Sequence, residues 1–187
     1  MSERTDDQLV QGCQAGDEQC FNELVYRYKN GLYQYIVALV HDETAAEDIF
    51  QEVFLSFYRR INEYKPEGKL KSYLFTSARN RVLNYFRDAD KAVSLDDTDE
   101  EGNAYLHEGI AGNDSTPLEG MAQNESLERI KEASLALPEK QREVVYLKQL
   151  MTFQEVAETV KRPLGTVLAD YHRGIKKMQQ LLQEAEL

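Results

Sequence analysis

The chain has 187 residues, of which 42% are hydrophobic and 29% are charged, and its formal net charge is −11. This length suits one or two domains, and no apolar run approaches the roughly 20 residues that a membrane-spanning helix needs. The first ten residues lack the apolar core of a signal peptide, so we expect a cytoplasmic protein without membrane insertion.

The negative charge is concentrated in the middle of the chain. Residues 89–137 hold 12 acidic and 3 basic residues, whereas residues 138–187 hold 7 acidic and 8 basic residues. Within residues 59–87, eight basic side chains are opposed only by Glu63 and Glu67. The overall charge argues against a nucleic-acid partner, but this local excess indicates a surface that faces phosphate groups.

The first block, residues 1–88, has helical apolar spacing. Thr44 and Glu47 have the spacing of a capping box, which predicts the start of a helix. Pro66 and Gly68 interrupt the helical pattern. The helices expected in this block cover about residues 17–40, 44–61 and 70–87.

Residues 89–122 are rich in Asp, Glu, Gly, Asn, Ser and Thr and contain few apolar residues. Such a composition cannot bury enough apolar surface to order a fold, so it predicts a flexible acidic linker. Helical periodicity then resumes and covers the second block, residues 123–187. The sequence shows no strand-like alternation.

The second block ends in a pattern typical of a helix-turn-helix. Pro138 suits the first position of a helix, and Thr152 with Glu155 forms a second capping box, which begins a short helix through Val160. A break at residues 161–163 precedes a longer helix, about residues 164–182. Lys161 stands where the tight turn usually carries glycine. A plain helical hairpin with a solvated basic face is the alternative.

Segments of both blocks resemble one known family, the extracytoplasmic-function group of the sigma-70 family of RNA polymerase sigma factors. Region two of that family is similar to GDEQCFNELVYRYKNGLYQYI, HDETAAEDIFQEVFLSFYRR and KLKSYLFTSARNRVLNYFR. Region four is similar to LPEKQREVVYLKQLMTFQEVAETVKRPLGTVLADYHRGIKKM. The resemblance implies an all-α fold, with a four-helix region two at 1–88, a linker at 89–122 and a helix-turn-helix region four at 123–187.

The resemblance also implies a function. A sigma factor binds core RNA polymerase, directs it to promoters and helps to separate the DNA strands. Its region two contacts the clamp helices of the largest subunit, and its region four contacts the flap of the other large subunit. The implied partners are therefore core polymerase, promoter DNA and, as in many relatives, an anti-sigma factor. No cofactor is implied.

The resemblance implies that the polymerase contact lies in the AEDIFQEVF segment and the residue after it. These residues are Asp48, Gln51, Glu52, Phe54 and Leu55. Without the resemblance, the favoured interpretation of these carboxylates is a solvated helix face.

The loop after this helix, and the helix that follows it, would hold the downstream promoter box as a single strand. Aromatic stacking combined with a basic track is how proteins hold unpaired bases. The alternative is that the two tyrosines belong to the core. The expected residues are Asn62, Tyr64, Lys65, Lys69, Lys71, Tyr73, Arg79, Asn80 and Arg81.

The longer helix of the helix-turn-helix would read the upstream promoter box as duplex. The run Leu168-Ala169-Asp170 departs from the Lys-Ser-Arg type of sequence common in the family, which predicts a weaker duplex contact. A carboxylate can nevertheless accept a hydrogen bond from cytosine N4. The expected residues are Arg162, Thr166, Asp170, His172, Arg173 and Lys176.

Two other functions remain open on the sequence: a helix-turn-helix regulator with an N-terminal sensor or dimerisation module, and a helical adaptor that does not bind DNA. An enzyme is the least supported class, because the three histidines are scattered and no catalytic constellation appears. Cys13 and Cys20 lack the partners of a metal site, so we expect reduced thiols and no bound metal.

Overall fold

The computed structural model describes residues 4–96, 129–130 and 132–184, and within these ranges the regular secondary structure is entirely helical. The chain divides into two compact units, Met1–Leu106 and His107–Leu187. The predicted all-α fold is therefore confirmed. The remainder of the predicted linker, residues 97–122, lies outside the described residues.

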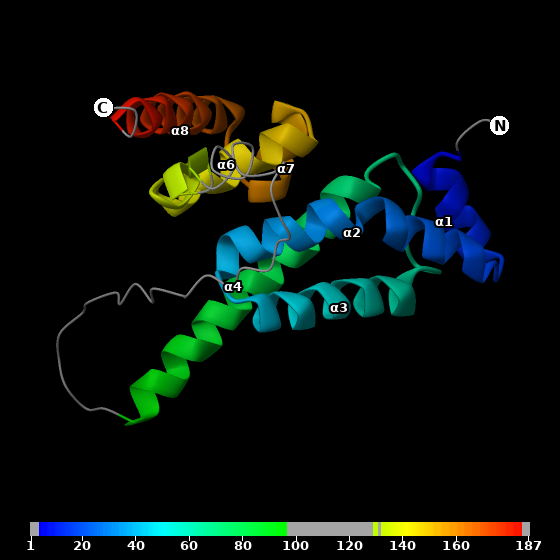
Figure 1. Cartoon of the computed structure of the whole chain (residues 1–187). Helices are drawn as coiled ribbons and strands as arrows, with labels where there is room; N and C mark the ends of the chain where they lie inside the picture. Colours follow the sequence, from blue (N-terminus) through cyan, green and yellow to red (C-terminus); the bar gives the residue numbers. More distant parts are fainter. Residues whose placement is uncertain (1–3, 97–128, 131, 185–187) are drawn as a thin grey trace, which may run out of the picture. The chain divides into compact units, whose positions relative to one another are not determined.

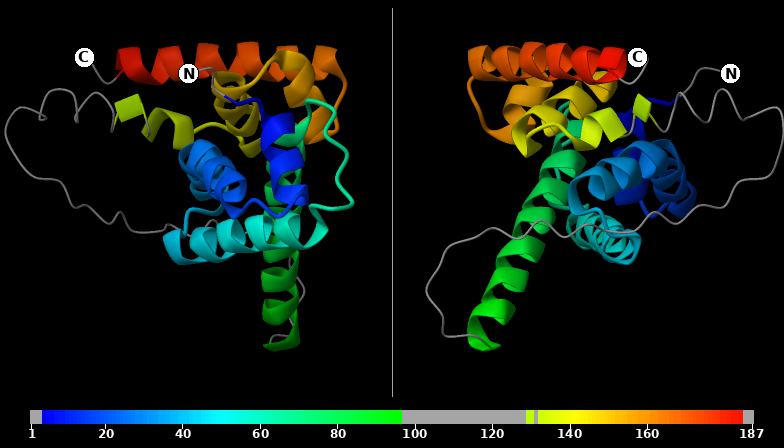
Figure 2. Two further views of the ribbon diagram at one scale, coloured as in Figure 1. Left: turned by 90° about the vertical axis from the view of Figure 1, so that its right-hand side faces the viewer. Right: turned by 60° about the vertical axis from the view of Figure 1, so that its left-hand side comes forward.

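The first unit is built around one central helix. α2 packs against α1, α3 and α4, and α3 also packs against α4. Figures 1 and 2 show that the C-terminal part of α4 projects beyond α2 and α3. The helices are α1 (Asp6–Gln14), α2 (Glu18–Val40), α3 (Glu43–Arg60) and α4 (Leu70–Asp96).

The core of the first unit lies between these helices. Leu24, Tyr35 and Ile36 of α2 are fully buried, as is Leu74 of α4, and Phe57 of α3 is 1% exposed. These positions recur at helical spacing, so each helix turns one apolar face inward. Burial of these side chains orients the opposite, solvent-facing sides of α3 and α4.

The start of α3 differs from the prediction. Asp42 is the N-cap, and its carboxylate accepts a hydrogen bond of 3.0 Å from the backbone N–H of Ala45. The predicted capping box of Thr44 and Glu47 is therefore wrong. His41 ends α2 in the left-handed conformation, with φ 58°, and the chain then reverses at Asp42. Aspartate is among the strongest N-cap residues, so the new helix begins there.

The N-terminal helix α1 is the fourth helix that the resemblance implies for residues 1–88, but the sequence analysis gave no residue range for it. Thr5 caps it, because its hydroxyl accepts from the Gln8 N–H while the Gln8 side chain accepts from the Thr5 N–H. Thr-x-x-Gln is a capping-box pattern, so the sequence did contain a signal for this helix.

α4 is longer than predicted. It continues to Asp96, whereas the expected helix ends at Arg87 and the expected linker begins at residue 89. Residues 88–96 contain neither Gly nor Pro, and Ala89, Ala92 and Leu95 are helix-forming residues. Composition places this segment with the acidic linker, but its local helix propensity extends α4 through it.

The second unit contains α6 (Glu139–Leu150), α7 (Phe153–Val160) and α8 (Leu164–Glu184). Residues 129–130 and 132–135 are also helical. α8 packs against both α6 and α7. A Cβ atom on Gly174 would lie 2.7 Å from Val145 Cγ2, so glycine permits the close approach of α6 and α8. Pro138 is the N-cap of α6 rather than its first helical residue.

Candidate nucleic-acid interface

Four of the predicted polymerase-binding residues share one exposed face of α3. Asp48, Gln51, Glu52 and Leu55 are all exposed. They are adjacent or three to four residues apart, which places them on one side of a helix. Leu55 is 52% exposed, so the face combines an apolar side chain with two carboxylates and an amide.

Phe54, the fifth predicted contact, lies in the core instead. It is 6% exposed, and its ring centroid is 5.1 Å from that of Phe50 and 6.3 Å from that of Phe21 on α2. The prediction of a polymerase contact is therefore wrong for this side chain. Phe54 follows Val53 on the inward side of α3, and it stabilises the helix that carries the exposed face.

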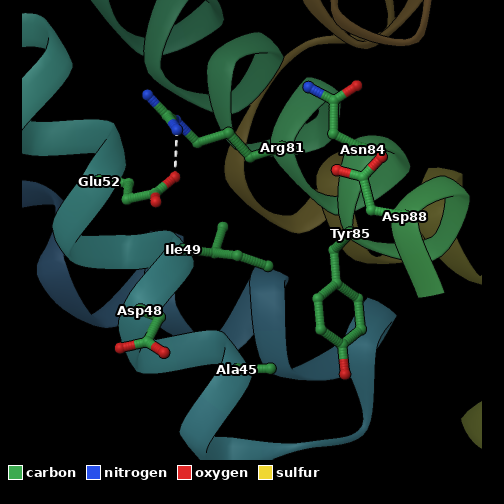
Figure 3. Close-up of a pocket in the computed structure, with 8 residues that line it drawn as sticks. All are labelled: Ala45, Asp48, Ile49, Glu52, Arg81, Asn84, Tyr85 and Asp88. Atoms are coloured by element: carbon green, nitrogen blue, oxygen red, sulfur yellow. Dashed lines mark hydrogen bonds and ion pairs between the residues drawn. The ribbon is translucent and has the colours of Figure 1, made fainter. Parts of the chain in front are cut away.

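An open groove with a volume of about 370 Å³ runs between α3 and α4. Figure 3 shows Glu52 of α3 and Arg81 of α4 facing each other across it, joined by an ion pair. Both side chains are partly solvated, with 61% and 28% of their surface exposed, so this pair contributes little to stability. The lining residues are Ala45, Asp48, Ile49, Glu52, Arg81, Asn84, Tyr85 and Asp88.

The groove joins two sites that the sequence analysis kept apart. Glu52 was assigned to polymerase binding and Arg81 to the single-strand path, yet the two side chains pair. Asn84, Tyr85 and Asp88 were not singled out, because only the crossing of α3 and α4 brings them to Asp48 and Glu52. Tyr85 is 38% exposed although it is aromatic, a property that the sequence does not reveal.

The loop between α3 and α4 presents polar and basic side chains. Asn62, Lys65 and Lys69 are exposed, as predicted for a loop that accepts a base. Gly68 adopts φ 70°, a left-handed conformation that favours glycine and turns the chain towards α4.

Two residues of α1 fix the backbone of this loop. Gln14 Nε2 donates hydrogen bonds of 2.7 Å to the carbonyl of Ile61 and 2.8 Å to the carbonyl of Tyr64. The Asp7 carboxylate accepts from the Gly68 N–H at 3.0 and 3.1 Å. Sequence reasoning missed both residues, because it left α1 unassigned and because each reaches a segment about 50 or 60 residues away.

Tyr64 and Tyr73 form part of an aromatic cluster at the edge of the core. Their ring centroids are 5.2 Å apart, and each lies 5.7 Å from that of the buried Phe57. Burial raises the pKa of Tyr64 to about 12, and its buried hydroxyl has no hydrogen-bond partner among the described residues. Both rings are half-buried, which favours the core alternative over a stacking surface.

On α4, the predicted single-strand residues differ in exposure. Asn80 is exposed, whereas Lys71, Arg79 and Arg81 are half-buried. Because Arg81 pairs with Glu52, its guanidinium is directed at α3. Among the basic residues predicted for the single-strand path, only Lys65 and Lys69 of the loop are therefore fully exposed.

α7 and α8 form the predicted helix-turn-helix. The Thr152–Glu155 capping box is present, and Lys161 ends α7 with φ 54°, the left-handed conformation that glycine usually supplies. Of the residues expected to read duplex DNA, four are exposed on α8: Thr166, His172, Arg173 and Lys176. Their spacing places them on one face of the helix.

Asp170 and Arg162 face inward, contrary to the prediction. Asp170 is 6% exposed, and its carboxylate accepts from Arg162 at 2.7 Å and from Arg173 at 2.6 Å. Arg162 also donates to the carbonyl of Lys140 at 3.3 Å. The inner face of α8 runs through Val167, Asp170 and Gly174, and periodicity missed Asp170 because a carboxylate is rarely buried unless it is paired.

The described residues contain no group of three or more His, Cys, Asp or Glu side chains that could hold a metal ion. Cys20 is buried and donates to the Asp17 carboxylate at 3.2 Å, and burial raises the pKa of Cys13 to about 11. None of the helices in the described part combines the length and the apolar character that a bilayer span requires.

Comparison with known proteins finds similarity to RNA polymerase sigma factors. The family model for sigma-70 region 2 matches residues 24–92. The chain is 27% identical to the RNA polymerase sigma-H factor of Pseudomonas aeruginosa, over 99% of this chain and 100% of that protein. It is also 27% identical to the ECF RNA polymerase sigma factor SigW of Bacillus subtilis, over 90% of this chain and 92% of that protein.

A solved structure shares the fold. The sigma factor RpoE of Bartonella quintana, in complex with the anti-sigma factor NepR, matches with a TM-score of 0.66 and 21% identity, over 87% of this chain and 96% of that one. The region 2 match covers most of α2, all of α3 and most of α4, and the relatives align along both units. By these comparisons, residues 24–92 match sigma-70 region 2, and the chain is similar along its length to sigma factors that include one of the extracytoplasmic-function group.

Proposed function

We propose that this chain binds core RNA polymerase and directs it to promoters as a sigma factor. The observation that carries the proposal is the alignment with a named sigma factor over 99% of this chain and 100% of the relative. A helix-turn-helix in the second unit and a region 2 match in the first accompany it. In this function the polymerase supplies the chemistry, and the chain itself catalyses no reaction and acts in the cytoplasm.

The proposed polymerase contact is the exposed face of α3. Leu55 can bury apolar surface against the clamp helices of the largest subunit, while Asp48, Gln51 and Glu52 offer hydrogen bonds and negative charge. An apolar centre within a polar rim is the usual anatomy of a protein interface. The adjoining groove between α3 and α4 extends this surface.

The proposed downstream promoter contact is the loop between α3 and α4. Capture of an unstacked base requires a shaped pocket with polar edges and cations for the neighbouring phosphates. Asn62, Lys65 and Lys69 are exposed and offer these groups. Tyr64 and Tyr73 then support the loop through Phe57 rather than stacking freely on bases.

The proposed upstream promoter contact is α8, the second helix of the helix-turn-helix. Such a helix enters the major groove with its N-terminal residues towards the bases. Arg173 and Lys176 lie further along the helix and suit phosphates, and Thr166 and His172 lie on the same face. The second unit would also contact the polymerase flap, with the acidic segment that follows α4 acting as the linker.

A further proposed partner is an anti-sigma factor, by analogy with the relative from Bartonella quintana that was solved with one.

We propose the following domain boundaries. Residues 1–88 form region two and residues 123–187 form region four. Residues 89–122 form the linker, and the end of α4 extends into it.

Binding to core RNA polymerase without DNA tests the proposal. We expect the full chain to form a complex at submicromolar concentration, and Leu55→Glu to weaken it by at least about ten-fold, as for an exposed interface anchor. Leu83→Glu is the matched control, because Leu83 is 44% exposed on α4 and does not line the groove. A helix-turn-helix regulator or an adaptor would show no tight core binding, and that result would reject the proposal.

A further inference from the structure

The first helix, α1, lies beside the loop between α3 and α4 and bonds to it at two points (Figure 1). Near the C-terminus of α1, the Gln14 amide donates to the carbonyls of Ile61 and Tyr64 at 2.7 and 2.8 Å. In its first turn, the Asp7 carboxylate accepts from the Gly68 N–H at 3.0 and 3.1 Å. Asp7 and Gln14 are about two helical turns apart, so α1 holds the two halves of the loop at a fixed separation.

α1 is in turn fixed to the body of the first unit. Its Leu9 side chain is fully buried. Asp6 forms an ion pair of 2.6 Å with Arg27 of α2 and accepts a hydrogen bond from the Tyr28 hydroxyl. The adjacent carboxylates of Asp6 and Asp7 therefore bond in different directions, one to α2 and one to the loop. The place of the loop is thus set by α2, through α1, as well as by the two helices that the loop joins.

The three backbone positions that α1 holds each precede an exposed side chain that we propose to bind DNA. Asn62, Lys65 and Lys69 directly follow these positions and are exposed. The two carbonyls that accept from Gln14 belong to the planar peptide groups that lead into Asn62 and Lys65. A fixed peptide plane limits the directions that the next side chain can take, so α1 orients the polar groups of the loop.

We propose that Gln14 and Asp7 are positioning residues for base capture, which hold the loop in the arrangement that accepts an unstacked base of the downstream promoter box. Groups that are already ordered bind better, because binding then orders little more of the chain. This inference rests on the proposed function and adds α1 to it, a helix that lies outside the residues 24–92 that match sigma-70 region 2.

Abasic sites in the promoter strand test the proposal, because each removes one base and leaves the phosphates in place. Holoenzyme is reconstituted from core polymerase and the full chain. The probe is a promoter selected from a template library by run-off transcription, with its downstream box unpaired. An abasic scan of that box locates the captured base as the position with the largest loss of affinity. For the unchanged chain we expect a loss of about ten-fold there, as for a base that is stacked and bonded.

Gln14→Glu tests the C-terminal end of α1. The substitution keeps the size of the side chain but removes the NH2 group that donates to both carbonyls. We expect the abasic penalty at the captured position to fall to about two-fold, while affinity for core polymerase without DNA is unchanged. Gln11→Glu is the matched control, because it introduces the same charge at an exposed position of α1 and should keep the ten-fold penalty.

Two substitutions of Asp7 test the other end of the loop. Asp7→Asn retains an oxygen that can accept from the Gly68 N–H, so the abasic penalty should stay near that of the unchanged chain. Asp7→Leu has no acceptor, and its penalty should fall as that of Gln14→Glu does.

Equal penalties for Gln14→Glu and Gln11→Glu, or for the two Asp7 variants, would overturn the proposal. Weaker binding of Gln14→Glu to core polymerase without DNA would also overturn it, because α1 would then act through the fold of the first unit and not through the loop. Failure of the proposed function is a different result: the unchanged chain would then start transcription on no template, and the inference would fall with it.

Discussion

The two units of the chain differ in where their charged side chains lie. In the first unit the exposed face of α3 and the following loop keep carboxylates and lysines in solvent, and Glu52 pairs with Arg81 at the surface. In the second unit Arg162 and Asp170 pair in the interior, and the start of α8 is left apolar. The exposed charges of the first unit lie on α3 and the following loop, whereas those of α8 in the second unit lie about two turns beyond its start, at Arg173, Lys176 and Lys177.

This difference has a consequence for promoter binding. Cations that contact phosphates provide most of the affinity of a DNA-binding protein. Because α8 carries only three basic side chains, Arg173, Lys176 and Lys177, and Asp170 holds Arg162, we expect the second unit alone to bind duplex weakly. Attachment to polymerase through the first unit should supply the remaining affinity.

The largest expected effect concerns the buried charges of the second unit. Asp170→Ala leaves Arg162 buried without its partner, so we expect the free energy of unfolding of the second unit to fall by about 3 kcal/mol. Urea unfolding followed by circular dichroism measures this free energy of unfolding. The double variant Arg162→Met with Asp170→Leu should recover most of the loss, because it removes both charges. If Asp170→Ala lowers the free energy of unfolding as little as the exposed Glu158→Ala does, the buried ion pair does not stabilise the second unit.

The next effect concerns the loop of the first unit. Gln14→Leu removes the hydrogen bonds to the carbonyls of Ile61 and Tyr64, and we expect a loss of about 1–2 kcal/mol in loop stability. Faster amide hydrogen exchange in residues 61–69 would report it. Gln11→Leu, an exposed change on the same helix, is the control. Equal exchange rates in the two variants would show that α1 does not hold the loop.

A smaller effect concerns the Tyr64 hydroxyl, which is buried and has no hydrogen-bond partner within the described part of the chain. Tyr64→Phe should leave stability at pH 7 unchanged or raise it by up to about 1 kcal/mol. The pKa of Tyr64 is raised to about 12. The contribution of its protonation to stability is therefore fully present below about pH 10, the ordinary pKa of tyrosine, and is lost as the pH rises towards 12. Tyr64→Phe should therefore lose less stability over that pH range than the unchanged chain. Identical profiles of stability against pH for the two proteins would refute the raised pKa of Tyr64.

The smallest expected change in stability is at the surface ion pair. Glu52→Gln should alter the free energy of unfolding by less than about 0.5 kcal/mol, because both partners are solvated. Binding to core polymerase should nevertheless weaken several-fold, in contrast to the exposed control Glu47→Gln on the same helix. A stability loss without a change in polymerase affinity would reverse the proposed role of this residue.

Much of the fold follows from local patterns. Apolar periodicity located α2, α3 and the start of α4, and the Thr152–Glu155 capping box located α7. Two of the errors lie where tertiary packing decides, and the others overlooked local signals. Phe54 and Asp170 turn inward because of the helices they pack against, and composition assigned the end of α4 to a linker.

The candidate site was predictable in part. The exposed α3 face follows from helical spacing, since Asp48, Gln51, Glu52 and Leu55 fall opposite the apolar stripe. The Gln14 and Asp7 contacts with the loop were not predictable, because they join segments far apart in sequence. The same holds for the pairing of Glu52 with Arg81, which requires the crossing of α3 and α4.

The most direct test of the central claim is run-off transcription with purified core polymerase on a template library with a randomised promoter region. The account predicts that adding the full chain causes initiation from a defined subset of templates that share two sequence boxes. Initiation no greater than with core polymerase alone, on every template, would contradict it.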